Sequence, residues 1–153
     1  MNITIRKARP EEAETLTDIS MRSKQSAGYD DAFMEACREE LKIHPEDIEH
    51  KHYWVAETKQ VCGVIGLDLE PNGDTAEVSS FFIDPAFKRQ GIGRLMWQEI
   101  VAQAQDLGLK SLSLASEPAA VPFYSAMGLA IVGEVPSGSI KGRVLPKMEL
   151  VLR

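Results

Sequence analysis

The chain has 153 residues, of which 44% are apolar, so its size and composition fit one domain covering residues 1–153. Its net charge of -6 at neutral pH disfavours a general nucleic-acid surface. No stretch reaches the length of a membrane span, and the first residues lack the apolar segment of a signal peptide, so we expect a cytoplasmic protein without nucleic-acid or membrane partners.

The first half of the chain predicts a strand followed by two helices. Residues 2–8 alternate between apolar and polar, as in a strand, and Pro10 opens a helix that runs to about residue 24. Asp30 or Asp31 caps a second helix, which Pro45 ends. The apolar positions of this second helix recur at helical spacing: Phe33, Met34, Cys37 and Leu41.

The rest of the chain alternates strands, turns and two further helices. Residues 53–56 and 61–67 predict an antiparallel hairpin, and residues 76–83 a third strand. A long helix over residues 91–107 ends at Gly108, and a short one over 118–127 ends at Gly128. The remaining strands are expected at 111–115, 129–135 and 145–152. This order predicts an α+β fold with a mixed, mostly antiparallel central sheet flanked by helices.

The cysteines and histidines offer no clear chemistry. Cys37 and Cys62 lack CxxC spacing and a nearby histidine cluster, so they are interpreted as buried thiols without an activating base. His44, His50 and His52 lack the i, i+4 spacing of a helical metal pair, and we expect no metal site.

A glycine-marked turn joins the third strand to the long helix. Gly91 and Gly93 let a ligand approach the backbone where the first N–H groups of the helix have no intrahelical partner. A phosphate group fits that position, and Lys88, Arg89 and Arg94 add positive charge. The spacing matches neither a P-loop nor a dinucleotide fingerprint, and the alternative is a turn whose glycines serve only close packing.

Two segments together carry a resemblance to a known family. Residues 83–93, which read IDPAFKRQGIG, and residues 123–129, which read FYSAMGL, occur within the expected order of elements. In this combination the chain resembles the GCN5-related N-acetyltransferases (GNAT) over essentially its whole length. Lys88 stands where the family pattern has Arg or Gln, which keeps a positive charge but loses the forked guanidinium.

The resemblance implies that acetyl-CoA is the acetyl donor and that no metal is used. Its pyrophosphate would lie at the turn and its pantetheine arm along the preceding strand. The implied cofactor-binding residues are Phe81, Phe82, Ile83, Lys88, Arg89, Gln90, Gly91, Ile92, Gly93 and Arg94.

The resemblance also implies catalytic roles. Tyr124 would protonate the departing CoA thiolate, and the alternative is a packed tyrosine bonded to the backbone. Glu77, on the strand before the turn, is a candidate general base or else a carboxylate at the strand edge. Glu117 stands where the family often has asparagine, and we interpret it as a residue at a helix N-terminus that can also approach the acceptor amine.

The acceptor is expected to be a primary amine of a small molecule, which attacks the thioester directly. Tyr29 and Arg143 are candidate substrate-binding residues, or else surface residues of their loops. The alternatives are a protein or peptide acceptor, and a non-catalytic acyl-CoA-binding regulatory module. The resemblance further implies a homodimer that forms through the last strands.

Overall fold

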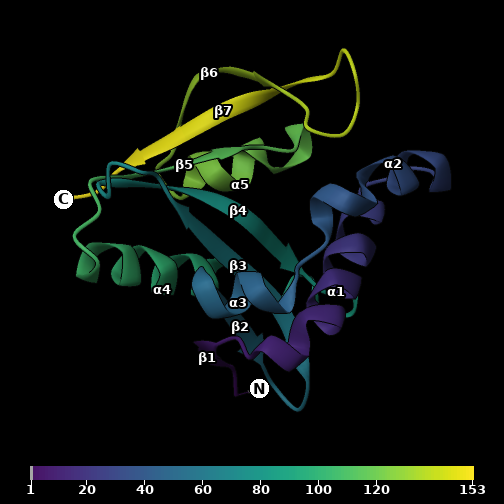
Figure 1. Ribbon diagram of the computed structural model, residues 1–153, viewed down its shortest axis with the longest axis horizontal. Helices are drawn as coiled ribbons and strands as arrows, with labels where there is room; N and C mark the ends of the chain where they lie inside the picture. Colours follow the sequence, from purple (N-terminus) through teal and green to yellow (C-terminus); the bar gives the residue numbers. More distant parts are fainter. Residues whose placement is uncertain (1) are drawn as a thin grey trace.

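The computed structural model describes residues 2–153 and contains one seven-stranded sheet, in the order β1-β2-β3-β4-β5-β7-β6 (Figure 1). All neighbouring strands are antiparallel except β4 and β5, which run parallel. The predicted mixed, mostly antiparallel sheet is therefore confirmed. The strands are β1 (Thr4–Lys7), β2 (His52–Glu57), β3 (Val61–Leu69), β4 (Thr75–Ile83), β5 (Ser111–Ala115), β6 (Ala130–Pro136) and β7 (Val144–Val151).

The helices follow the predicted order, with one addition. They are α1 (Ala13–Gln25), α2 (Asp31–Leu41), α3 (Pro45–His50), α4 (Ile92–Asp106) and α5 (Val121–Ala126), with short 3-10 turns at Pro10–Glu12, Pro85–Phe87 and Pro118–Ala120. Pro45 was expected to end the second helix, but that helix ends at Leu41 and Pro45 begins α3. Proline is favoured at the first position of a helix, where its missing N–H would have no partner, and this explains the difference.

The helices cover both faces of the sheet. On β2 the side chains of Trp54 and Ala56 pack with α4, whereas Tyr53 and Val55 pack with α1 and α3. Successive strand residues point to opposite faces, so β2 is buried on both. Cys37 and Cys62 are free and buried, as expected.

The parallel pair of strands separates after a few residues. β4 pairs with β5 only from Thr75–Ser111 to Glu77–Ser113. Beyond this point β4 continues against β3 alone, and β5 continues against β7. Ser79 is an extra residue in β4, because Ser80 pairs with Gly66 and Val78 with the next residue of β3. The edge of β4 that faces β5 is thus open over its second half, and a groove forms there.

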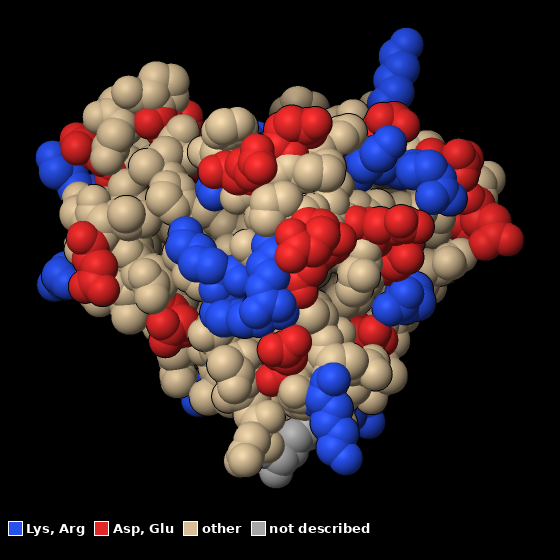
Figure 2. Space-filling model, turned by 60° about the horizontal axis from the view of Figure 1, so that its bottom comes forward, with Lys and Arg blue, Asp and Glu red and all other residues tan. Residues whose placement is uncertain are grey.

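The outer end of the sheet carries exposed apolar side chains: Ile131, Val132, Val144 and Val151. The homodimer stays a prediction, and these strands are where it would form. On the face shown in Figure 2, acidic and basic side chains are interspersed. Across residues 2–153 no helix is long and apolar enough to cross a bilayer. Within the same range there is no cluster of three or more residues suited to hold a metal ion.

Candidate active site

The turn between β4 and α4 has the backbone shape of an anion site. Arg89 and Gly91 adopt left-handed conformations, with φ of 64° and 78°. Gly91 is also the N-cap of α4, so the first N–H groups of a fifteen-residue helix follow it directly. Left-handed residues that alternate with others in a turn direct successive N–H groups into one concavity, and the helix dipole adds to its positive potential.

Positive side chains surround this turn without being neutralised. In the described part of the chain Arg89 and Arg94 form no ion pair, and both are exposed. The nearby carboxylate of Asp84 is already paired with Arg22, at 2.7 Å between Nη2 and Oδ2. Burial opposes the ionisation of Asp84, but the N–H of Ala86 and the Arg22 guanidinium outweigh it and hold its pKa below the usual value. Asp84 therefore repels an incoming phosphate only weakly.

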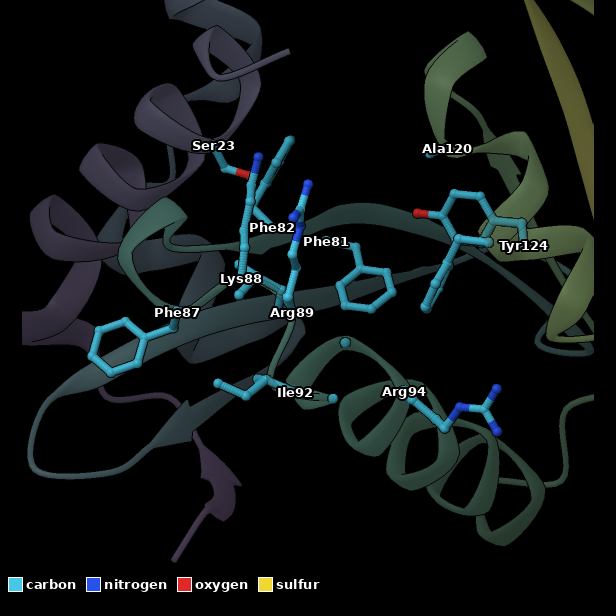
Figure 3. A pocket seen from close by; sticks show the side chains of 14 residues that line it. Ser23, Phe81, Phe82, Phe87, Lys88, Arg89, Ile92, Arg94, Ala120 and Tyr124 are labelled. Atoms are coloured by element: carbon cyan, nitrogen blue, oxygen red, sulfur yellow. The ribbon is translucent and has the colours of Figure 1, made fainter. Parts of the chain in front are cut away.

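A cavity of about 540 Å³ opens next to the turn, and we call it the turn cavity (Figure 3). It contains all of the cofactor-binding residues predicted above except Gln90, which lies in the turn but does not line the cavity. Four further residues line it that the sequence did not indicate: Ser23, Phe87, Ala120 and Phe123.

Tyr124 lines the turn cavity, with its hydroxyl directed into the open space (Figure 3). Its ring is held by aromatic neighbours: the centroids of Phe123, Trp97 and Phe81 lie 5.4, 5.8 and 6.3 Å away. Tyr124 as a whole residue is only 9% exposed, and among the described residues its hydroxyl has no hydrogen-bond partner. Burial, together with the negative charge of Glu117, raises the pKa of this phenol, so it stays protonated at neutral pH.

A second cavity, of about 710 Å³, carries three carboxylates, those of Glu40, Glu77 and Glu117, and we call it the carboxylate cavity. It shares part of its lining with the turn cavity: Ser23, Phe81, Phe82, Ala120 and Tyr124. The two cavities therefore meet where the Tyr124 hydroxyl lies. Molecules bound in the two cavities can therefore approach each other at this junction.

The two candidate carboxylates of the second cavity differ in their surroundings. Glu77 is an exposed residue on β4 and forms no ion pair among residues 2–153. The protein nevertheless removes part of the water around its carboxylate, and this desolvation, together with the nearby negative charges of Glu70 and Asp68, raises the pKa of Glu77. Desolvation acts to raise the pKa of Glu117, but hydrogen bonds from Lys24, Tyr29 and Arg143 outweigh it and keep this pKa below its usual value. Glu77 is thus free to take up a proton, whereas Glu117 is held as an anion.

Tyr29 and Arg143 lie next to the carboxylate cavity but are not among its lining residues. Both bind Glu117: the Tyr29 hydroxyl donates to its carboxylate, and Arg143 Nη2 lies 3.2 Å from Oε2. Their direct contact with a substrate stays a prediction. Lys24 and Glu40 were missed as residues of this cavity, because charges on the exposed turns of a helix look the same in sequence whether solvent or a cavity lies beside them.

The fold thus combines a mixed sheet whose parallel strands separate with a glycine turn at a helix N-terminus beside the gap. Residues 14–129 match the model of the Acetyltransferase (GNAT) family, and the chain belongs to this family. It is 31% identical to the peptidyl-lysine N-acetyltransferase YjaB of Salmonella typhimurium (strain LT2), over 99% of both chains.

Solved structures have the same fold. The PaiA N-acetyltransferase of Thermoplasma acidophilum, in complex with coenzyme A, superposes with a TM-score of 0.81 at 21% identity, over 99% of both chains. YncA of Salmonella typhimurium, solved with acetyl-CoA, gives 0.71 at 21% identity, over 100% of this chain and 95% of the other. Family membership confirms the predicted acyltransferase class with acetyl-CoA as its donor.

Proposed function

We propose that this protein transfers the acetyl group of acetyl-CoA to a primary amine of a small molecule by direct attack on the thioester. The observation that carries the proposal is the junction of the turn cavity and the carboxylate cavity at Tyr124. Donor and acceptor can bind in separate spaces and meet at one point, which supplies the proximity that the reaction needs.

The donor would bind from the turn towards this junction. Its pyrophosphate would accept hydrogen bonds from the backbone N–H groups of the turn at Gly91. The positive charges of Arg89 and Arg94 would add electrostatic attraction. Its pantetheine arm would pair with the open edge of β4, whose backbone groups have no partner strand beyond Glu77. A β4 N–H close to the thioester carbonyl would stabilise the oxyanion that forms on attack.

The acceptor amine must lose a proton, and we propose Glu77 as the base, acting directly or through water. Glu77→Gln should lower kcat/KM at neutral pH about a hundredfold, the lower end of the usual range for an acid or base. Wild-type activity should fall as the pH drops below the pKa of Glu77, since the protonated carboxyl no longer accepts a proton. This part of the pH profile should be absent in the variant, and only the ionisation of the amine should remain.

The control for this prediction is Glu134→Gln, which removes the same charge from an exposed position on β6. Its profile should match that of the wild type. If Glu77→Gln retained both the rate and the acidic limb of the wild-type profile, Glu77 would not be the base.

A lysine side chain of a protein or peptide is the second candidate acceptor. It is favoured by the relative YjaB, a peptidyl-lysine N-acetyltransferase at 31% identity. A lysine side chain presents the same primary amine, so the chemistry at the junction would be identical.

Thiol release from acetyl-CoA, measured against polyamines, amino acids, aminoglycosides and lysine peptides, tests the proposal. We expect release that depends on one class of small amine. Demonstrable acetyl-CoA binding with no amine-dependent release across the panel would contradict it.

A further inference from the structure

The C-terminal end of α1 lies against the turn that joins β4 to α4. Arg22 Nη2 is 2.7 Å from Asp84 Oδ2, and the ammonium group of Lys88 donates a hydrogen bond to the hydroxyl of Ser26. Ser23, which lies between Arg22 and Ser26 in the sequence, lines the turn cavity and points towards the side chain of Lys88 (Figure 3). The end of α1 thus contacts the turn segment at both of its ends, Asp84 and Lys88.

Asp84 places a negative charge next to a turn that is otherwise basic. It is the only acidic residue in the segment 84–94, which carries three basic ones. Its Oδ1 accepts a hydrogen bond of 3.1 Å from the N–H of Ala86 and so caps the 3-10 turn Pro85–Phe87. Asp84 is only 7% exposed, so water screens its charge poorly. The carboxylate therefore shapes the turn, but its charge opposes the binding of an anion there.

Arg22 compensates this charge. Within residues 2–153 it is the only basic side chain that pairs with Asp84, and it bonds to Oδ2, the oxygen that does not cap the turn. The Arg22 side chain is 53% exposed and lines neither cavity. Its effect on a ligand in the turn cavity is therefore electrostatic and acts through Asp84.

We propose that Arg22 is a positioning residue for the donor, because it cancels the charge of Asp84 and so keeps the turn attractive to the phosphates of acetyl-CoA. This inference rests on the proposed function, which places the pyrophosphate at the turn. Arg22 lines neither cavity and so contacts neither the thioester nor the acceptor. Its removal should therefore weaken the binding of a donor that carries phosphates, and this effect should depend on the charge of Asp84.

The test is a double-mutant cycle read out by calorimetric titration with acetyl-CoA at low ionic strength. Arg22→Met keeps the apolar stem and removes the charge. It should raise the dissociation constant about tenfold, the factor expected for a unit charge left unpaired roughly 10 Å from a charged ligand near a protein surface. Asp84→Asn keeps an oxygen for the N–H of Ala86, and Arg22→Met/Asp84→Asn should recover most of the lost affinity. Arg38→Met is the control, because Arg38 is equally exposed at 53% and pairs with Glu35 on α2; its affinity should equal that of the wild type.

A second readout separates this charge effect from a general disturbance of the site. S-acetyl-pantetheine has the same thioester and pantetheine arm as acetyl-CoA but no phosphate. The preference for acetyl-CoA over S-acetyl-pantetheine, measured as the ratio of their dissociation constants, should fall about tenfold in Arg22→Met, because only the phosphates respond to the unpaired charge of Asp84. The difference between Arg22→Met and the wild type should also shrink as the ionic strength rises.

Wild-type affinity for acetyl-CoA in Arg22→Met would overturn the proposal, and so would a loss of affinity that Asp84→Asn does not restore. If Arg22→Met does not fold, Asp84→Asn alone decides: it should bind acetyl-CoA at least as tightly as the wild type, and weaker binding would overturn the proposal. A wild type that binds acetyl-CoA and S-acetyl-pantetheine equally well contradicts the proposed donor site itself. A clear preference for acetyl-CoA that Arg22→Met leaves unchanged contradicts only the role of Arg22.

Discussion

Tyr124→Phe is expected to lower kcat about a hundredfold or more, the usual effect of removing a general acid, with little change in acetyl-CoA affinity. The hydroxyl has no partner in the described chain and points into the junction of the two cavities, so its loss leaves no unpaired group behind. The raised pKa of the phenol keeps the proton available. A thiolate that forms in the same desolvated place is also a stronger base than in water, and this favours the transfer.

The measurements are steady-state thiol release and calorimetric binding of acetyl-CoA. Tyr53→Phe is the matched control, because Tyr53 is a tyrosine of similar burial on the other face of the sheet and lines neither cavity. It should retain wild-type kcat. Equal turnover by Tyr124→Phe and the wild type would remove Tyr124 from the acid role.

Gly91→Val is expected to weaken acetyl-CoA binding more than tenfold. Gly91 has a φ of 78°, which costs a residue with a side chain about 1–2 kcal/mol. A side chain there would also occupy the space through which we propose that the phosphates of acetyl-CoA approach the N–H groups of α4. Loss of one hydrogen bond to a charged group is worth about 1.5–3 kcal/mol, which corresponds to more than tenfold in the dissociation constant.

Gly108→Val is the control variant that separates the effect of backbone strain on stability from the effect of a side chain on acetyl-CoA binding. Gly108 follows the other end of α4 with a φ of 76°, and like Gly91 it has open space where a Cβ would be. Thermal unfolding should show a similar loss of stability in both variants, whereas only Gly91→Val should lose affinity in a calorimetric titration. Wild-type affinity in Gly91→Val would show that the turn does not bind the pyrophosphate.

Local patterns were enough to predict most elements and the turn between β4 and α4. Two apolar runs around a short turn predicted β2 and β3, and glycines predicted the ends of α4 and α5, where Gly108 and Gly128 have positive φ. The turn from Lys88 to Gly93 was predicted as an anion site because glycine spacing, a helix start and basic residues coincide within a few positions. Elements without such a local pattern were missed, as α3 shows, because a proline marks either the end of one helix or the start of the next.

The carboxylate cavity was less predictable. Glu77 and Tyr124 were named from the resemblance, but the sequence did not show that they line one cavity. The same holds for Glu117, whose role depends on Lys24, Tyr29 and Arg143, which lie 93, 88 and 26 positions away. Neither periodicity nor turn chemistry extends over such separations.

The sequence by itself determined the order of strands and helices, the backbone of the turn and the position of a tyrosine after β5, since each follows from preferences that act within a few residues. The tertiary structure decided where β4 and β5 separate, that two cavities meet at Tyr124, and that Arg143 bonds to Tyr29, 114 positions earlier in the chain. These features depend on how helices pack on the sheet and on which strands pair across it. Contacts between remote residues form only when the chain has folded, because the free energy that holds them comes from burial shared by the whole core.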